Sequence, residues 1–205
     1  MMNWVHTPIC LQKMFPQMIW QVPTSEKEIF LTFDDGPTPG VTPQVLAFLL
    51  EYQAKASFFC LGARIEQYPE LFHEIKAAGH VIGNHGYKHL SGFTTSHKLY
   101  LQNVLKGEEL SGSRLFRPPY GRITPWMSNS LKKHHQLIMW TTMSMDFNAK
   151  ITAERCFQNA IGKIAPGTVL VFHDSEKAAK NLLIVIPRLL QWCKENGFKA
   201  KALSF

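Results

Sequence analysis

Residues 28–37, EIFLTFDDGP, place two adjacent carboxylates directly after an apolar run. The run 28–33 is rich in β-branched and aromatic residues and is typical of a buried strand, and the Gly-Pro step that follows the carboxylates is typical of a tight turn. A second stretch of this kind is TVLVFHD (168–174), in which a histidine and an aspartate follow an apolar run. Open α/β sheets bind their ligands at the carboxyl ends of the strands. Both stretches therefore predict a functional edge of a parallel sheet.

Strand-like runs alternate with helix-like stretches along the whole chain. Strands are expected at residues 28–33, 56–60, 80–83, 115–117, 136–140, 168–172 and 198–203. Helices are expected at residues 42–52, 69–78, 96–110, 124–134, 152–164 and 178–196. This alternation predicts a parallel sheet with helical crossovers. For one domain of this length it favours an α/β fold whose sheet closes, or nearly closes, into a TIM-like barrel.

The totals fit one globular domain. The chain has 205 residues, 45% of them hydrophobic, and no run approaches the roughly 20 apolar residues that cross a bilayer. The N-terminal stretch lacks the basic start, apolar run and cleavage site of an export signal, so we expect a cytoplasmic protein without a membrane span. The cysteines, which are far apart and expected to be buried free thiols, are Cys10, Cys60, Cys156 and Cys193.

The basic charge is spread over the chain. The net charge is +7, but lysines and arginines form no dense run and do not alternate with aromatic residues. We therefore expect a solvated basic surface and no nucleic-acid partner, while the oligomeric state stays open.

The polar residues that could carry chemistry gather at one end of the predicted barrel. They follow the carboxyl ends of five expected strands, where barrel enzymes hold their active sites. They are Asp34 and Asp35 after the first strand, His85 and His89 after the third, Arg117 and Tyr120 after the fourth, Asp146 after the fifth, and His173 after the sixth.

Asp35, His85 and His89 are the candidate metal ligands. If residues 85–89 form a helical turn, the i, i+4 spacing turns both imidazoles to one face. Two histidines and a carboxylate leave coordination positions open, as catalytic metal sites do. The alternatives are a solvated Asp-Gly turn and histidines that only cap a turn or fill the core. Asp34 is then the candidate base for a metal-activated water, and Arg117 is expected to pair with it.

The remaining candidates would act when a metal-activated water cleaves an amide, on its departing amine and its carbonyl oxygen. His173 is a candidate acid, with Asp146 holding its charge, although a core histidine is the alternative. The backbone N–H of Tyr120 is expected to stabilise an oxyanion. Leu170 is expected to wall a pocket for a methyl group. Asp174 is expected to cap the segment that follows it.

Taken together, the motifs TFDDGP, His85-x3-His89, RPPYG and LVFHD resemble the polysaccharide deacetylases of carbohydrate esterase family four, the NodB-homology domain. KASFFCLG at 55–62 also resembles the second strand of that family. The resemblance covers roughly residues 28–203. It divides the chain into a lead-in segment, 1–27, and a deacetylase domain, 28–205.

The resemblance implies a distorted (β/α)7 barrel and one divalent metal ion, with zinc first and cobalt or another transition metal as alternatives. It implies hydrolysis of N-acetyl, or of O-acetyl, groups on an amino-sugar polymer or oligomer such as chitin or peptidoglycan, or on acetylxylan. It gives the site residues the roles just described: Asp34 as base, Asp35, His85 and His89 as ligands, Arg117 and Asp146 as partners, and His173 as acid.

Four positions depart from the family pattern. Gly86 stands where a serine or threonine is usual, and Leu90 stands where a proline often follows the second histidine. Met143 replaces an aspartate and Phe147 a tryptophan. The last two lie near the expected substrate face, so they bear on the substrate more than on the chemistry. Other functions also stay open. These are hydrolysis of a different amide by a deformylase or cyclic amidase, a catalytically silent carbohydrate-binding protein, and an iron-dependent oxygenase.

Overall fold

Strand β1 (Glu28–Asp34) lies at the centre of a curled parallel sheet in the computed structural model, which describes residues 4–204. The strands run in the order β5-β4-β3-β2-β1-β7-β6, and β8 pairs with the first half of β1. The other strands are β2 (Ser57–Cys60), β3 (Val81–Asn84), β4 (Leu115–Phe116), β5 (Gln136–Leu137), β6 (Thr142–Met143), β7 (Thr168–His173) and β8 (Lys199–Lys201). All these pairings are parallel, and the sheet forms the distorted α/β barrel that the sequence predicted.

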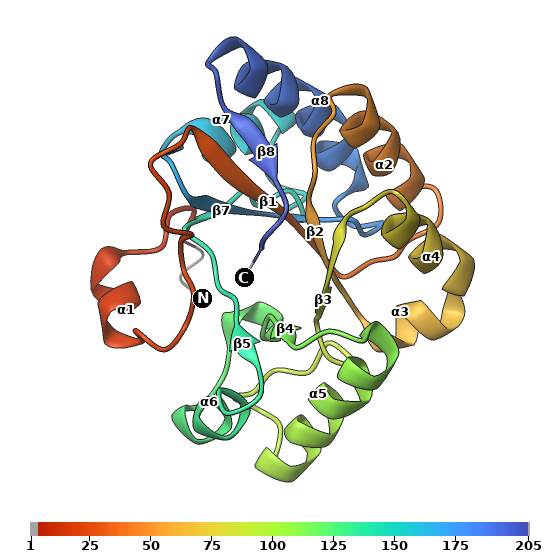
Figure 1. Ribbon diagram of the computed structural model, residues 1–205, viewed down its shortest axis with the longest axis vertical. Coiled ribbons are helices and arrows are strands. Elements are labelled where there is room, and N and C mark those ends of the chain that lie inside the picture. Colours follow the sequence, from red (N-terminus) through yellow and green to blue (C-terminus); the bar gives the residue numbers. More distant parts are fainter. Residues whose placement is uncertain (1–3, 205) are drawn as a thin grey trace.

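Helices cover the outside of this sheet (Figure 1). They are α1 (Ile9–Met14), α2 (Thr42–Glu51), α3 (Gly62–Gln67), α4 (Pro69–Ala77), α5 (His97–Ser111), α6 (Pro125–Leu131), α7 (Ala153–Ile161) and α8 (Ala179–Glu195). Their ends follow local rules. Thr124 and Thr152 accept hydrogen bonds from the first turns of α6 and α7, and α5 ends at Gly112 in the left-handed conformation.

Alternation along the strands separates two packing faces. Leu31 and Phe33 of β1 pack in the core between the sheet and the surrounding helices, together with Leu170 and Phe172 of β7. Phe30 of β1 belongs to a second cluster that fills the barrel interior. Successive strand residues point to opposite faces. The interior face of each strand therefore ends in the polar side chains at its carboxyl end.

Residues 4–27 complete the barrel at the gap between β5 and β6. The N–H of Ile19 donates to the carbonyl of Leu137, and the N–H of Met139 donates back to the carbonyl of Ile19. Nearer the N-terminus, the N–H of Thr7 donates to the carbonyl of Thr141. Residues 1–3 of the expected lead-in lie outside the described residues. The segment that follows them packs as part of the barrel wall.

The predicted helices and strands are present where the apolar runs are long, but some short elements were missed and some bounds were wrong. Strand β6 and helices α1 and α3 were not expected, and the strand expected at 136–140 forms a ladder only at Gln136–Leu137. Helix α6 is shorter than the range expected at 124–134. Of the four cysteines, Cys10 is exposed and so contradicts the prediction, whereas the other three are buried free thiols.

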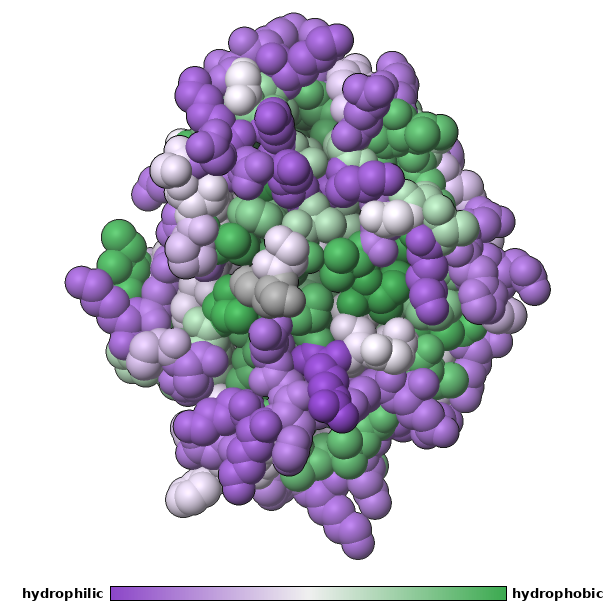
Figure 2. Space-filling model, viewed as in Figure 1, coloured by the Kyte–Doolittle hydropathy of each residue, from purple (hydrophilic) through white to green (hydrophobic). Residues whose placement is uncertain are grey.

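The surface is mostly hydrophilic around its edge in the view of Figure 2, where hydrophobic residues gather toward the middle. None of the helices within residues 4–204 combines the length and apolar character that a membrane-spanning helix requires.

Candidate functional site

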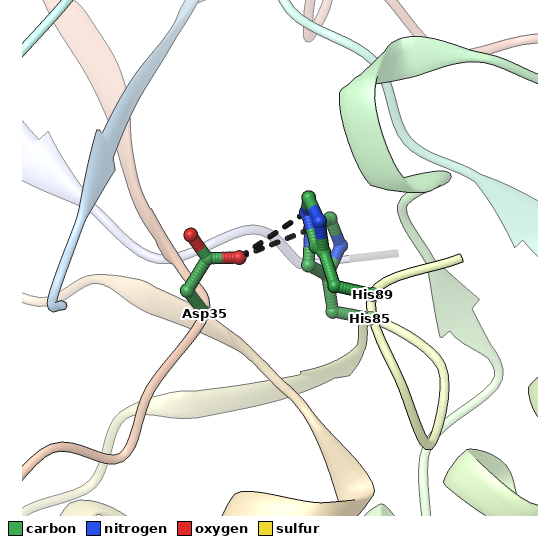
Figure 3. A group of neighbouring side chains, drawn as sticks. All are labelled: Asp35, His85 and His89. Atoms are coloured by element: carbon green, nitrogen blue, oxygen red, sulfur yellow. Dashed lines mark ion pairs between the residues drawn. The ribbon is translucent and has the colours of Figure 1, made fainter. Parts of the chain in front are cut away.

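Asp35, His85 and His89 meet at the carboxyl end of the sheet and form a candidate metal site (Figure 3). One ligand atom from each residue lies within 4.8 Å of the others. Oδ1 of Asp35 is 3.3 Å from Nε2 of His89 and 3.7 Å from Nε2 of His85. Zinc–ligand bonds of about 2.0–2.2 Å place neighbouring ligand atoms at separations of this order.

The chemistry of this donor set fits a cation. Oδ1 of Asp35 is buried and accepts no hydrogen bond from the described residues. Asp35 also has a φ of 79°, a left-handed conformation that costs energy for a non-glycine residue. Burial, together with His85, lowers the pKa of His89 to about 4, so its imidazole is neutral and able to bind a metal at pH 7.

The segment from His85 to His89 is an irregular loop, so the two histidines do not meet through the helical turn that was considered for this spacing. Gly86 has a φ of 82°, which breaks the helical path. A Cβ at this position would also lie 2.5 Å from Nδ2 of Asn103, so glycine fits where the family usually has serine or threonine. The two imidazoles still face the same point because side chains of neighbouring elements hold the backbone of this loop.

Two buried asparagines hold this loop. Oδ1 of Asn103 accepts the N–H of Lys88 at 2.8 Å, and its Nδ2 donates to the Lys88 carbonyl at 2.9 Å. Oδ1 of Asn84 accepts the N–H of Gly86 at 2.7 Å. Sequence reasoning missed both residues. Asn84 stands next to His85, which was a local signal, whereas Asn103 lies on α5 and gave none.

The orientation of His85 is set by a backbone carbonyl. Its Nδ1 lies 2.8 Å from the carbonyl oxygen of Arg117, which leaves Nε2 to face Asp35. Metal-binding histidines commonly donate their second N–H in this way, and the contact fixes the tautomer.

Asp34 and Arg117 form a buried ion pair beside the metal ligands. Nη1 of Arg117 donates to Oδ1 of Asp34 at 2.7 Å and to Oγ1 of Thr32 at 2.8 Å. The guanidinium is fully buried and also donates to the backbone carbonyls of Ile138 and Met139. The expected contact between the two residues is present. It places a charged carboxylate next to the cluster of ligands.

His173 and Asp146 form a second charged pair at the site. Nδ1 of His173 lies 2.8 Å from Oδ1 of Asp146, and the backbone N–H of His173 donates to Oδ2 at 2.7 Å. Burial disfavours the charged imidazole, but the Asp146 carboxylate outweighs it and raises the pKa of His173 to about 9. Asp34 and Asp35 contribute in the same direction. The imidazole is therefore protonated at neutral pH in the protein without metal.

Asp174 does not cap the following helix, which corrects the prediction. Its Oδ1 accepts the N–H of Gly36 at 3.1 Å, and its Oδ2 accepts the hydroxyl of Thr42 at 2.6 Å. A Cβ at Gly36 would collide with the Asp174 carboxylate, which explains the glycine after the two aspartates. Burial raises the pKa of Asp174 to about 8. The residue supports the turn that carries Asp34 and Asp35.

Leu170 points away from the site, and the expectation that it walls a pocket is wrong. It is fully buried with Phe172 in the core against the helices. Val171, which alternation places on the same face as His173, occupies the interior position instead.

Tyr120 does lie at the site, with its ring centroid 4.2 Å from that of His89. Within the described residues its backbone N–H donates to no backbone carbonyl, and its φ is 60°.

The other departures from the family pattern also lie near these residues. The ring of Phe147 meets that of His173 edge-on, with centroids 4.9 Å apart. Met143 pairs with Val171 in the sheet. Leu90, next to His89 in the chain, packs against the apolar cluster that contains Tyr100, Phe116 and Met127.

Comparison with known proteins agrees with this geometry. The family model described as Polysaccharide deacetylase matches residues 21–137. A peptidoglycan-N-acetylglucosamine deacetylase from Bacillus cereus is 30% identical over 192 residues, covering 90% of each chain. A chitooligosaccharide deacetylase from Azorhizobium caulinodans is 30% identical over 164 residues, covering 75% of this chain and 77% of that protein.

The fold is also that of a solved deacetylase. The crystal structure of the Bc1960 peptidoglycan N-acetylglucosamine deacetylase, in complex with 4-naphthalen-1-yl-N-oxidanyl-benzamide, superposes with a TM-score of 0.88 at 26% identity. The match covers 96% of this chain and 95% of that one. The motifs, the metal-ligand cluster and these similarities agree, and the chain belongs to the polysaccharide deacetylase family.

Proposed function

We propose that this protein hydrolyses the N-acetyl group of N-acetylglucosamine residues in a polysaccharide or oligosaccharide such as peptidoglycan or a chitooligosaccharide. One observation carries the proposal. A buried carboxylate paired with arginine and a mostly buried imidazole paired with aspartate lie at the same end of the sheet as a three-residue ligand cluster. Amide hydrolysis needs a base for water and an acid for the departing amine, and these two pairs supply them.

A metal would be held by Asp35, His85 and His89. Two imidazole nitrogens and one carboxylate oxygen suit zinc, and cobalt is the alternative. When bound, the ion would lower the pKa of a water molecule and polarise the acetyl carbonyl. The unpartnered Oδ1 of Asp35 and the neutral imidazole of His89 are ready to bind without first losing a hydrogen bond or a proton.

Asp34 takes the proton of the attacking water in this scheme. The bond from Nη1 of Arg117 occupies one carboxylate oxygen, Oδ1, and leaves Oδ2 to accept a proton. The Arg117 guanidinium also pairs with this buried carboxylate, and their attraction offsets part of the cost of burying the two groups.

His173 gives a proton to the nitrogen of the departing amine. Its Nδ1 is engaged by Asp146, so Nε2 is the atom that donates. The Asp146 carboxylate contacts both the backbone N–H and the ring Nδ1 of His173. These two contacts fix the direction in which Nε2 points. The Tyr120 N–H, left without a backbone acceptor among the described residues, is proposed to donate to the carbonyl oxygen as charge develops on it.

The relatives support an acetylated amino sugar as substrate. Their names describe deacetylation of peptidoglycan N-acetylglucosamine and of chitooligosaccharides. A silent carbohydrate-binding protein would need no buried acid–base pairs, which cost energy to maintain. The location of the protein in the cell stays a prediction.

Acetate release from chitooligosaccharides and from peptidoglycan tests the proposal. The protein is stripped of metal with a chelator, then reloaded with zinc or cobalt. Release that returns with the metal supports the function, whereas metal uptake without release of acetate from either substrate would contradict it. His85→Ala should abolish metal uptake, measured by elemental analysis. The matched control is His73→Ala, which removes an exposed histidine on α4 and should leave metal content unchanged.

A further inference from the structure

The loop that carries Asp146 leaves the sheet after strand β6, which has only two residues. Within this loop Met145 has a φ of 66°, a left-handed conformation that costs energy for a residue with a side chain. Its side chain is also buried, with 5% exposed. Such a conformation persists only where the surrounding structure holds it. The position of Asp146 therefore depends on contacts that reach the loop from other elements.

Two buried asparagines provide contacts of this kind. Nδ2 of Asn159 on α7 donates to the backbone carbonyl of Ser144 at 3.1 Å. Nδ2 of Asn181 on α8 donates to the backbone carbonyl of Asp146, also at 3.1 Å. The two carbonyls flank Met145 in the chain. The residue with the unfavourable φ is therefore held from both sides by side chains of the outer helices.

Both asparagines occupy positions on their helices that otherwise belong to the apolar core. Asn159 is 6% exposed and precedes the core residue Ala160, and Asn181 is 3% exposed and precedes the core residue Leu182. Asparagine is mostly exposed in proteins, and burying its amide is costly unless the amide makes hydrogen bonds. The bonds to the 144–146 loop offset that cost, and they explain why polar residues stand at these two positions.

The neutral charge of these donors matters for the carboxylate that they position. Asp146 contacts His173 through the ring Nδ1 and through the backbone N–H. A lysine or arginine in place of either asparagine would bring a second positive charge near Asp146 and weaken its attraction for the imidazole. An amide can hold the backbone of the loop without adding a charge that competes with the ring.

We propose that Asn159 and Asn181 are positioning residues, which hold the 144–146 loop so that Asp146 keeps the His173 imidazole in place. The effect on turnover rests on the proposed function, whereas the effect on the ring concerns the metal-free protein as well. The side-chain hydrogen bonds of both asparagines within residues 4–204 go to this loop. Their loss should therefore disturb the acid and leave the metal ligands in place.

Asn159→Ala and Asn181→Ala test the proposal in the zinc-loaded enzyme. Each should lower kcat for acetate release by about tenfold or more, because small displacements of a catalytic group have effects of this size. The KM and the zinc affinity should stay within about twofold of the parent values, since neither asparagine contacts a ligand cluster residue through its side-chain hydrogen bonds.

Cys193→Ala is the matched control for a general loss of stability. It truncates a buried side chain of α8 that lies about three turns beyond Asn181. Urea unfolding shows how far each variant is destabilised, and the control should keep the kcat of the parent. A fall in kcat in the control as large as in the asparagine variants would overturn the proposal.

A double-mutant cycle separates positioning from other structural roles. If Asn181 acts through Asp146, adding Asn181→Ala to Asp146→Ala should change kcat by no more than about twofold. A further loss as large as that caused by Asn181→Ala in the parent would show that its effect does not pass through Asp146, and would overturn the proposal.

NMR of the metal-free protein gives a measurement that needs no turnover. The signals of the His173 ring nitrogens are assigned by their absence in His173→Ala. The double variant Asn159→Ala, Asn181→Ala should shift them, whereas Cys193→Ala should not. Unchanged signals in the double variant would overturn the inference even if the protein deacetylates its substrate. Shifted signals in a protein that releases no acetate would support the positioning role and contradict the proposed function.

Discussion

His173 and Asp146 are joined by two hydrogen bonds from one residue to one carboxylate, through Nδ1 at 2.8 Å and through the backbone N–H at 2.7 Å. The double contact makes Asp146 responsible both for the position of the ring and for its charge. It raises the pKa of His173 to about 9 in spite of burial, which acts in the opposite direction.

Asp146→Asn should shift the pH profile of activity. Loss of the carboxylate charge removes the main cause that raises the pKa of His173, so the imidazole should lose its proton at lower pH. Activity that needs the protonated ring falls as pH rises through that pKa. We expect the alkaline limb of kcat/KM to move to lower pH and turnover to fall by about 10²-fold or more. An alkaline limb unchanged from the parent enzyme would contradict the assignment of His173 as acid.

Asp34→Asn should keep the metal and lose turnover by at least about 10²-fold, the usual scale for loss of a general base. It should also lower the free energy of unfolding, because the Arg117 guanidinium is fully buried and would lose its anionic partner. Breaking a buried ion pair on one side costs about 3–5 kcal/mol. Acetate release, metal content and urea unfolding are the three measurements.

His173→Ala provides the contrast. The His173 side chain is 12% exposed, and its removal leaves Asp146 with the backbone N–H of residue 173 and of Phe147 as donors. Turnover should fall to a similar extent as in Asp34→Asn, with a smaller loss of stability. Retained turnover in either variant would remove that residue from the mechanism.

Asn103→Ala should weaken metal binding without touching a ligand. The substitution removes both hydrogen bonds to Lys88 that hold the loop between His85 and His89. Groups that orient metal ligands typically contribute about 10–100-fold in affinity or activity. Zinc affinity is measured by competition with a chelator. The neighbouring exposed residue gives the control, since Gln102→Ala should leave affinity unchanged. Equal affinity in both variants would contradict a role for the Asn103 side chain in positioning the metal ligands.

Asp174→Asn should change how stability depends on pH. The pKa of Asp174 is raised to about 8 in the folded protein, above the value of about 3.9 expected for an unfolded chain. The stability that this proton contributes is present below the unfolded pKa and is lost as pH rises toward 8. The variant lacks this titration. Urea unfolding of the metal-free proteins at pH 5 and pH 8.5 should show a smaller loss of stability in the variant, and an identical loss would contradict the prediction.

The sequence was sufficient where the signal was local. Strands β1 and β7 carry long apolar runs followed by charged residues, so both the strands and the position of Asp34, Asp35 and His173 at their ends could be predicted. Strand β6 has only two residues, and it exists because its neighbours β7 and Val5 provide hydrogen-bonding partners. No pattern within residues 142–143 contains that information.

Contacts between distant residues explain the other errors. Asp174 was expected to act on the segment next to it, but its partners Gly36 and Thr42 are 138 and 132 positions away. Asn103 holds a loop 15 positions before it. The face of Leu170 was misjudged because a strand buried on both sides has apolar residues at every position. In each case the decisive partner is brought close only by the folded barrel.

The hydrogen bonds from Thr7 and Ile19 to Thr141 and Leu137 have a consequence for the synthesis of this protein. The ribosome makes residues 4–22 first and their partners much later, so at ordinary translation rates the early segment waits on the order of ten seconds. Until then residues 4–22 have open hydrogen-bonding groups, and the edges of β5 and β6, once made, stay open until that segment pairs with them; both favour pairing with other chains. The nascent protein therefore closes its barrel late, and a chain that lost its first 22 residues would keep those edges open for good.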